Sequence, residues 1–274
     1  MKKIVLFIFV QFLLLFGLLW QMPDGRFHIY FLDIGQGDSV LIVTPEGHQI
    51  LVDGGPAGEV MNELAEVMPF FDKTIDMIVL SHPHADHMDG LIEVLERYQV
   101  DKVLMTGASY GGSHYEEFLG ELDDEEVILA NADSDFVFGS VSFDILYPFE
   151  SVVGQDYANI NNSSISMMVE YGDVRILLTG DLEEEGELEL GGLDLKADIF
   201  KAGHHGSRTS STPFMLSKVR PEIVVIQSGK DNKFGHPHAE TLRNFERFGV
   251  REVRRNDLEG RIEFSYGGDG YRHR

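Results

Sequence analysis

Apolar and polar positions alternate along this chain in a way that predicts many short strands with helices between them. Short apolar runs bounded by glycine, proline and acidic residues are typical of strands. Such runs occupy residues 27–34, 39–43, 49–52, 75–80, 100–105, 127–129, 141–146, 165–171, 174–178, 199–201, 223–227 and 262–266. Helical spacing of apolar residues predicts helices over residues 59–68, 90–98, 183–190 and 239–248. This mixture predicts an α/β domain in which two sheets pack together with helices outside.

The first twenty residues form a separate, strongly apolar segment. Lys2 and Lys3 precede residues 4–20, which are apolar except for Gln11 and Gly17. A membrane anchor needs about 17–25 apolar residues, whereas a secretory signal ends in a small-x-small cleavage site that is absent before Gln21. We expect residues 1–20 to be an anchor or a cleaved signal, 21–26 a linker and 27–274 one domain. The two lysines favour export of that domain, either membrane-anchored outside the cytoplasm or secreted.

Composition restricts the chemistry that the domain can perform. The chain of 274 residues has 22 Lys and Arg against 46 Asp and Glu, a formal net charge of −24. This charge disfavours a broad basic face for nucleic acid, but divalent cations in a cleft could still attract phosphates. The chain has no cysteine, which excludes disulfides and thiolate-bound zinc. A metal site would therefore consist of His, Asp and Glu.

Residues 81–87 concentrate metal-ligand side chains at the end of a predicted buried strand. Three histidines and one aspartate lie within six residues, as His82, His84, Asp86 and His87. Pro83 favours extended geometry at His82, so His82 and His84 can point the same way. One loop can thus present His82 and His84 to one metal ion and Asp86 and His87 to another.

Two later strands also end in potential ligands. Residues 174–178 lead to Asp181, and residues 199–201 lead to His204 and His205. Strand ends are where catalytic side chains gather in sheet proteins. Alone, Asp181 could equally be the N-cap of a following helix.

Together these segments resemble the metallo-β-lactamase superfamily, and within it the hydrolase domain of ComEC-type competence proteins. The resemblance extends from residue 27 to 266 and includes these segments: Leu32-Asp33-Ile34-Gly35-Gln36-Gly37-Asp38-Ser39, Val52-Asp53-Gly54-Gly55, residues 81–87, Asn161-Asn162-Ser163-Ser164, Thr179-Gly180-Asp181, His204-His205-Gly206-Ser207 and Gly235-His236-Pro237-His238. It implies a four-layer αββα sandwich with two divalent metal ions, Zn²⁺ or Mn²⁺, at one sheet edge.

The resemblance also implies roles for the ligand candidates. His82 and His84 would bind the first metal, Asp86 and His87 the second, and Asp181 would bridge the two. His204 would add to the second metal, with His205 as the alternative ligand. The superfamily pattern includes a third histidine for the first metal, but no histidine lies between His114 and His204. Such an oxygen-richer site suits Mn²⁺ as well as Zn²⁺.

Several neighbouring residues have both a supporting and a merely structural interpretation. Asp53 could orient a ligand histidine or only complete a turn, and Asp33 and Asp38 could support the metals or cap a loop. Asn162 and Ser163 occupy the region of the missing histidine, and His236 and His238 could face the substrate or precede a helix. The cations near these motifs are expected on the solvated surface; they are Lys201, Arg208 and Lys233.

The leading functional hypothesis is a metal-dependent phosphodiesterase or nuclease. A hydroxide shared by two metals would attack the phosphorus, with Asp86 and Asp181 at the metals and His236 assisting the leaving oxygen. By resemblance, single-stranded DNA or another phosphodiester is the expected substrate, with a possible link to DNA uptake. The alternatives are an envelope hydrolase of another ester class, such as a lactonase or phosphorylcholine esterase, and a non-catalytic metal-binding domain.

Overall fold

The computed structural model describes residues 24–122, 125–267 and 270–273, together with residues 3, 7–9 and 11 near the N-terminus. Most of the expected anchor and linker (residues 1–26) therefore lies outside the described residues. Among the described residues, no helix has the length and apolar character needed to cross a bilayer.

The first sheet has eight strands in the order β15-β14-β1-β2-β3-β4-β5-β6. Pairing is antiparallel from β15 to β3 and parallel from β3 to β6. Its strands are β1 (Phe27–Phe31), β2 (Val40–Val43), β3 (Gln49–Val52), β4 (Thr74–Leu80), β5 (Gln99–Met105), β6 (Glu126–Leu129), β14 (Ile262–Gly267) and β15 (Gly270–His273).

The second sheet has seven strands in the order β13-β12-β11-β10-β9-β8-β7. Pairing is parallel from β13 to β10 and antiparallel from β10 to β7. Its strands are β7 (Phe136–Phe138), β8 (Val141–Tyr147), β9 (Ser166–Tyr171), β10 (Val174–Leu178), β11 (Ile199–Lys201), β12 (Ile223–Ile226) and β13 (Glu252–Arg255).

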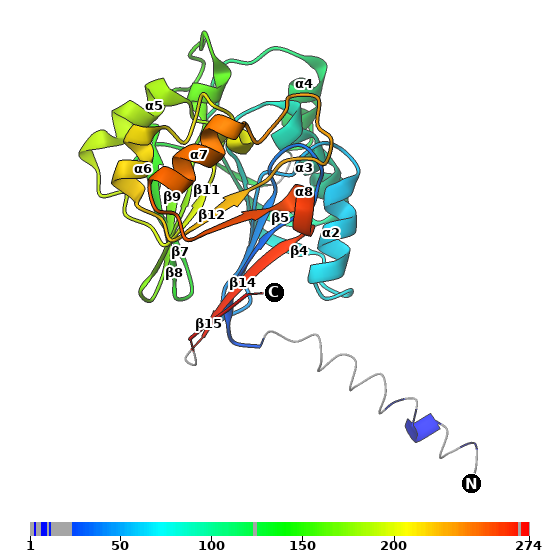
Figure 1. The fold of residues 1–274 in the computed structure, drawn as a ribbon. Coiled ribbons are helices and arrows are strands. Elements are labelled where there is room, and N and C mark those ends of the chain that lie inside the picture. The colour runs from blue at the N-terminus through cyan, green and yellow to red at the C-terminus, as the bar shows by residue number, and fades with distance from the viewer. Residues whose placement is uncertain are drawn as a thin grey trace.

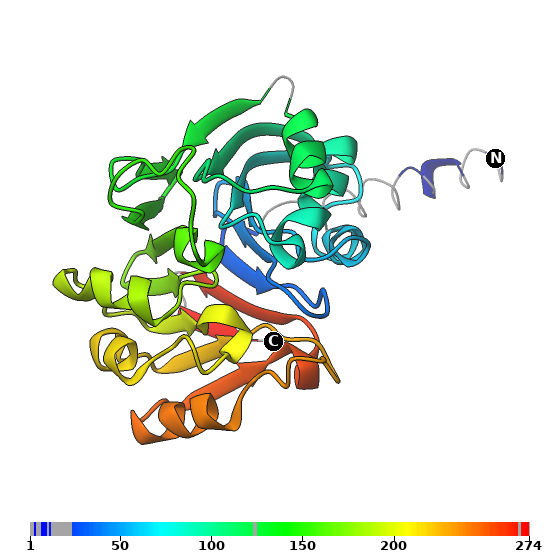
Figure 2. The same ribbon diagram turned by 90° about the horizontal axis from the view of Figure 1, so that it is seen from above.

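Helices cover the outer face of each sheet (Figures 1 and 2). The first sheet is covered by α2 (Glu59–Val67), α3 (Ala85–Arg97) and α4 (Ser113–Gly120), and the second by α5 (Glu184–Glu189), α6 (Pro213–Val219) and α7 (Ala239–Arg247). Shorter elements are α8 (Asn256–Glu259), η1 (Ile160–Ser163), η2 (Leu190–Gly192) and η3 (Gly203–Gly206).

Three apolar cores separate the four layers. The central core joins the sheets through residues such as Phe31 and Phe143. Leu64 packs in the core beneath α2 and α3, and Phe245 packs in the core on the other side, beneath α6 and α7. Alternation along β1 places Phe27 and Phe31 inward, because successive strand side chains face opposite sides. The expected four-layer αββα sandwich is confirmed.

The structure differs from the predicted elements mainly where the pattern is short or polar. Helix α3 begins at Ala85 rather than residue 90, so the second half of the histidine motif lies on its first turn. Strand β13 carries the sequence EVRR at the sheet margin, and α4, α6, β7 and β15 were also not predicted. An edge strand can remain polar, so it lacks the apolar run that identifies buried strands.

Candidate metal centre

The strands that end in the candidate ligands all run toward the same edge of the sandwich. Strands β1, β3 and β4 share one direction in the first sheet, and β10 and β11 are parallel in the second. Their carboxyl ends therefore deliver side chains that are far apart in sequence to one place. The residues that follow these strands are Asp38, Asp53, His82 to His87, Asp181, His204 and His205.

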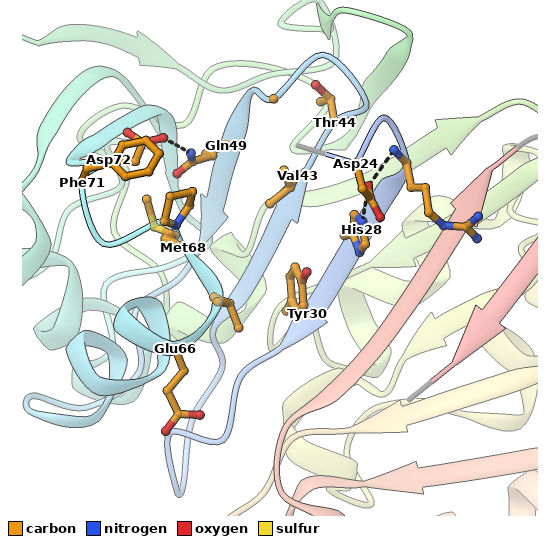
Figure 3. Close-up of a pocket in the computed structure, with 14 residues that line it drawn as sticks. Asp24, His28, Tyr30, Val43, Thr44, Gln49, Glu66, Met68, Phe71 and Asp72 are labelled. Carbon is orange, nitrogen blue, oxygen red and sulfur yellow. Dashed lines mark hydrogen bonds and ion pairs between the residues drawn. The ribbon is translucent and has the colours of Figure 1, made fainter. Parts of the chain in front are cut away.

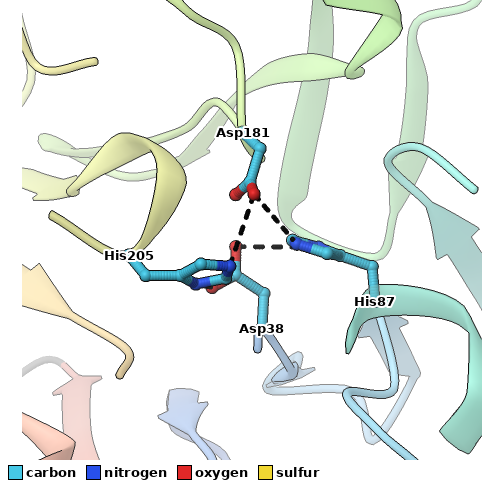
Figure 4. A group of neighbouring side chains, drawn as sticks. All are labelled: Asp38, His87, Asp181 and His205. Atoms are coloured by element: carbon cyan, nitrogen blue, oxygen red, sulfur yellow. Dashed lines mark hydrogen bonds and ion pairs between the residues drawn. The ribbon is translucent and has the colours of Figure 1, made fainter. Parts of the chain in front are cut away.

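Four buried side chains form the centre of this edge: Asp38, His87, Asp181 and His205 (Figure 4). One nitrogen or oxygen atom from each lies within 4.8 Å of the others. The Nε2 atoms of His87 and His205 each lie 3.3 Å from Oδ2 of Asp181. One carboxylate thus faces two imidazoles that come from different sheets.

The unpaired atoms in this cluster fit a divalent cation. His87 Nε2, His205 Nε2 and Asp181 Oδ1 are buried and have no hydrogen-bond partner among the described residues. Buried polar atoms are normally satisfied, and imidazole nitrogen with carboxylate oxygen is a donor set that Zn²⁺ and Mn²⁺ accept. The residues present therefore suit the expected metal.

The two central histidines are oriented by carboxylates from behind. Nδ1 of His87 hydrogen-bonds Oδ2 of Asp53 at 2.8 Å, and Nδ1 of His205 hydrogen-bonds Oδ1 of Asp38 at 3.1 Å. In each pair the carboxylate accepts, so Nδ1 carries the proton and Nε2 faces Asp181. Such carboxylate partners fix the tautomer and raise the basicity of metal-ligating histidines.

Lys201 lies inside this network rather than on the surface. Its side chain is 2 % exposed, and Nζ pairs with Oδ2 of Asp38. Sequence reasoning favoured a solvated Lys201, which the structure contradicts. Because a buried charge is costly unless paired, Lys201 and Asp38 tie the end of β11 to the β1–β2 loop.

The local backbone of the site is strained where it presents these side chains. Asp53, His204 and His205 have φ values of 58°, 47° and 55°. Non-glycine residues in the left-handed region cost roughly 1–3 kcal/mol each and cluster at functional sites. Gly37 has φ +138°, and a Cβ there would lie 2.1 Å from the carbonyl oxygen of Asp86. Only glycine lets the two loops approach this closely.

Electrostatics make the cluster a dense ionic network. Burial opposes charge on His87 and His205 and by itself would lower the pKa of both imidazoles. The carboxylate of Asp181 outweighs burial, with Asp53 adding to it at His87 and Asp38 adding to it at His205. The pKa of each imidazole is therefore raised well above the usual value. Burial similarly opposes charge on Asp181, yet His205 and His87 hold the pKa of that carboxyl well below its usual range. The raised pKa of both imidazoles means that a cation bound here would displace their protons, since metal binding releases ligand protons.

The first half of the histidine motif lies beside the four-residue cluster. The His82 ring is centred 4.2 Å from the His87 ring, and Nε2 of His82 lies 3.0 Å from Nδ1 of His84. Burial and the neighbouring His87 lower the pKa of both rings, so both are neutral, as metal ligation requires. Asp86 places Oδ2 3.4 Å from Nε2 of His205.

The structure places His205, rather than the favoured His204, at the centre of the site. The four-residue cluster contains His205, which is 1 % exposed, and not His204. Nδ1 of His204 lies 3.1 Å from Oε1 of Glu183, and its Nε2 lies 3.7 Å from Oδ2 of Asp181. His204 therefore sits at the rim of the cluster, with one ring nitrogen already engaged.

Two other residues predicted to support the metals or the substrate, Asp33 and Asn162, lie away from the four-residue cluster. Asp33 is exposed, and its backbone N–H donates to Glu63, with no contact to the cluster. The side chain of Asn162 bonds to the N–H of Glu183 and to Glu185.

Ser163 is likewise buried and donates its hydroxyl to the carbonyl of Ile160. Asn162 and Ser163 therefore shape loops near the site, and neither of these contacts reaches the four-residue cluster.

His236 and His238 extend the site outward. The His236 ring is centred 5.5 Å from His204 and 6.2 Å from His205. Burial, with His205 and His204 beside it, lowers the pKa of His236 to about 4. His238 accepts a hydrogen bond from the backbone N–H of Arg208.

Sequence reasoning gave too little weight to the residues that support the ligands. The sequence leaves Asp38 open between metal support and loop capping, and it indicates no individual role for Ser81 or Ser164. Ser81 donates both its N–H and its hydroxyl to Asp53, and Ser164 Oγ accepts the N–H of Asp181. The available indication was position, since each adjoins a ligand motif at a strand end.

A separate cavity of about 530 Å³ lies on the outer face of β1 and β2, beside the end of α2 (Figure 3). His28, Tyr30 and Phe71 are among its lining residues. None of the residues that line it belongs to the four-residue cluster. The candidate chemistry is therefore at the strand ends rather than in this cavity.

Comparison with known proteins agrees with this architecture and site. Residues 32–229 match the Metallo-beta-lactamase superfamily. ComE operon protein 3 of Bacillus subtilis is 30% identical over 86% of this chain and 32% of its own length. Recombination protein 2 of Haemophilus influenzae is 30% identical over 90% of this chain and 30% of its own length. The chain thus spans about a third of these relatives, and the expected similarity to ComEC-type competence proteins is confirmed.

A solved structure extends the comparison to the fold. The metallo-beta-lactamase fold protein YhfI from Bacillus subtilis aligns with a TM-score of 0.57 at 12% identity, covering 84% of this chain and 96% of that protein. At this identity the likeness supports the fold alone. The family assignment rests on the match over residues 32–229 and on the competence relatives. This chain is a member of the metallo-β-lactamase superfamily.

Proposed function

We propose that this protein is a metal-dependent phosphodiesterase that hydrolyses nucleic acid, with single-stranded DNA as its substrate. The observation that carries the proposal is the convergence of His87 Nε2, His205 Nε2 and Asp181 Oδ1, all buried and without a hydrogen-bond partner among the described residues. Each buried polar atom that lacks a hydrogen bond costs about 1–3 kcal/mol, and a bound divalent cation would remove this cost. The names of two relatives, Recombination protein 2 of Haemophilus influenzae and Competence protein ComA of Neisseria gonorrhoeae, direct the proposal to DNA.

Bound divalent ions, Zn²⁺ or Mn²⁺, would supply an activated water and neutralise charge on the phosphoryl oxygens. His82, His84, Asp86, His87, Asp181 and His205 are the residues that would hold them. Asp53 and Asp38 keep His87 and His205 in the tautomer that leaves Nε2 free. Ser164 fixes the backbone of Asp181 at 3.1 Å, so this carboxylate stays between the two imidazoles.

The chain's own residues also provide for the leaving group. In the proposed hydrolysis, water adds its oxygen to phosphorus, a P–O ester bond breaks, and the released alkoxide receives a proton. His236 is the candidate proton carrier at the rim, since its ring adjoins His204 and His205. Its pKa of about 4 keeps it neutral, so it would first take the proton that the attacking water releases and then pass it to the alkoxide. His204 lies on the same side and would contact the substrate there.

The proposed location is outside the cytoplasm, with the N-terminal apolar segment attached to the membrane. Its support is the sequence of residues 1–20, two lysines followed by an apolar run, which favours a cytoplasmic N-terminus. A nuclease in that position would meet DNA outside the cell.

A metal-supplemented substrate panel tests the proposed function. The full chain, purified in detergent, is treated with chelator and then given Mn²⁺ or Zn²⁺ with single-stranded DNA, bis-p-nitrophenyl phosphate or a lactone. We expect hydrolysis of both phosphodiesters only after metal is restored, and none by an Asp181→Asn variant. Hydrolysis that survives chelation refutes the proposal. Cleavage of the lactone alone would assign the enzyme to another ester class. The net charge of −24 favours such a small substrate over long DNA, which is itself negatively charged.

A further inference from the structure

A continuous row of rings crosses the metal centre and ends in an exposed aromatic side chain on each side. From one end, the Tyr110 ring is centred 5.9 Å from His84. From the other, Phe234 stacks on His236 at 5.7 Å with an interplanar angle of 23°. Between them, neighbouring rings lie 4.2–6.2 Å apart in the order His84, His82, His87, His205 and His236. Tyr110 and Phe234 thus flank the candidate ligands.

Tyr110 is held in place but presents an open face. It follows β5, and its ring also contacts the buried Tyr115 edge-on at 5.9 Å. The backbone before it is fixed because Ser109 N–H donates to the carbonyl of Gln155 at 2.9 Å. Tyr110 nevertheless remains 36 % exposed. A rigid, exposed ring loses little entropy when a flat ligand stacks on it.

Phe234 is presented in the same manner from the second sheet. Asn232 organises its loop by accepting the N–H groups of Phe234 and His236 and donating to the carbonyl of His236. Phe234 is 49 % exposed, and Lys233 Nζ lies 5.1 Å from the centre of its ring. The loop also carries Lys230 and Asp231, so a net positive charge accompanies this ring in a strongly acidic chain.

We propose that Tyr110 and Phe234 form two nucleobase-binding subsites, one on each side of the scissile phosphodiester. This inference rests on the proposed function and deepens it. A phosphate at the central histidines places the preceding and following nucleotides toward the two ends of the row. All four kinds of unpaired base can stack on an aromatic ring, whereas the bases of a duplex are already stacked on one another. The two subsites therefore select single strands without selecting sequence.

Paired measurements on the full chain test this inference. KM and kcat are measured for Tyr110→Ala and Phe234→Ala on a single-stranded oligothymidylate and on the same backbone with abasic residues. Stacking loss should raise KM for oligothymidylate by about 5- to 150-fold for each variant, with kcat within about twofold of wild type. Neither variant should change KM for the abasic strand. Tyr110→Phe and Phe234→Trp should retain the wild-type KM. Phe70→Ala is the matched control, because Phe70 is 68 % exposed and belongs to neither subsite.

Binding measurements separate this inference from the proposed activity. Fluorescence anisotropy of labelled oligothymidylate and labelled abasic strand reports binding with or without hydrolysis. Tighter binding of oligothymidylate that disappears in Tyr110→Ala and Phe234→Ala supports the subsites, even if no metal restores hydrolysis and the proposed activity fails. Equal affinity for the two strands, or equal loss with both strands in the variants, overturns the subsites while leaving the phosphodiesterase proposal in place.

Discussion

Asp38 accepts a hydrogen bond from Nδ1 of His205 at 3.1 Å, although 167 positions separate them in the chain. The same carboxylate pairs with Lys201. Asp38 follows β1 of the first sheet, whereas Lys201 and His205 belong to the end of β11 in the second. The two sheets are therefore joined at the metal centre by buried charge as well as by the apolar core.

This relationship predicts that Asp38→Asn destabilises the protein mainly by leaving Lys201 buried without its counter-ion. Removing one partner of a buried pair costs about 3–5 kcal/mol. The double variant Asp38→Asn/Lys201→Met should recover part of that loss, because no unpaired charge remains. Urea unfolding with chelator present measures these two variants and the Lys201→Met single variant. Strictly additive losses for the two substitutions would show that the pair is not coupled.

Asp53 predicts a different outcome, seen in metal affinity. Its two oxygens accept three hydrogen bonds, from His87 Nδ1 and from the N–H and hydroxyl of Ser81. In Asp53→Asn, an amide NH₂ group replaces one of the accepting oxygens and faces a hydrogen-bond donor instead. The His87 ring therefore loses the bond that orients it. Affinity for Mn²⁺ or Zn²⁺ should fall about 10–100-fold, measured by titration calorimetry. Asp33→Asn serves as the control, since Asp33 is exposed and does not contact the cluster.

The neighbouring histidines should respond unequally to substitution. His205→Ala removes a buried ring whose Nε2 faces Asp181 at 3.3 Å, whereas His204→Ala removes a rim residue already engaged by Glu183. We expect His205→Ala to lose bound metal and His204→Ala to retain most of it. Metal content after gel filtration, measured by mass spectrometry, distinguishes them. The reverse result would restore the order expected from the sequence.

The ligand motifs were readable from sequence because they concentrate His and Asp at the ends of apolar strands. His82 and Asp86 are ligand candidates from their residue types and positions alone, whereas Asp181 alone could equally be a helix N-cap and takes a metal role only through the family resemblance. Most strands were predicted for the same reason: a buried strand must be apolar on the face it presents to a core. The ligand motifs and the buried strands can therefore be identified from residues that are neighbours in the sequence.

The supporting residues could not be assigned in this way because their roles depend on contacts across the sandwich. Asp38 follows the turn glycines Gly35 and Gly37, where an aspartate is common without any further role. Lys201 follows the general expectation that lysine is solvated, and only the packing of β11 against the β1–β2 loop buries it. His204 and His205 are neighbours, and their left-handed backbone decides which one points inward.

Glu187 of α5 lies outside the metal centre and makes the free energy of unfolding depend on pH. Its carboxyl is buried and accepts hydrogen bonds from Ser211 N–H and from the N–H and hydroxyl of Thr212. Burial outweighs these bonds and raises its pKa to about 7, from 4.5 in an unfolded chain. The folded state therefore binds the proton more tightly, so stability from this group is complete below about pH 4.5 and is lost as pH rises toward 7.

This shift predicts that Glu187→Gln changes the pH profile of unfolding. The free energy of unfolding of wild type minus that of the variant should fall by about 3 kcal/mol between pH 4.5 and pH 8. Urea titrations across this range, with chelator in every sample, measure the difference. Taking the difference cancels the titration of the histidine cluster, which both proteins share. A constant difference would place the pKa of Glu187 at its ordinary value.

Metal binding should stabilise the fold, because the ligands come from segments that only the folded chain brings together. A ligand that binds only the native state adds about 2.7 kcal/mol to the free energy of unfolding when present at 100 times its Kd. Mn²⁺ or Zn²⁺ should therefore raise the urea midpoint of the wild type in a concentration-dependent manner. Asp181→Asn should abolish most of this rise, since one neutral oxygen replaces the carboxylate that faces both His87 and His205.

Ca²⁺ should stabilise less than Mn²⁺ or Zn²⁺, because it prefers an all-oxygen site. Equal stabilisation of wild type and Asp181→Asn would place the bound cation elsewhere on this acidic chain and remove the four-residue cluster as the metal centre.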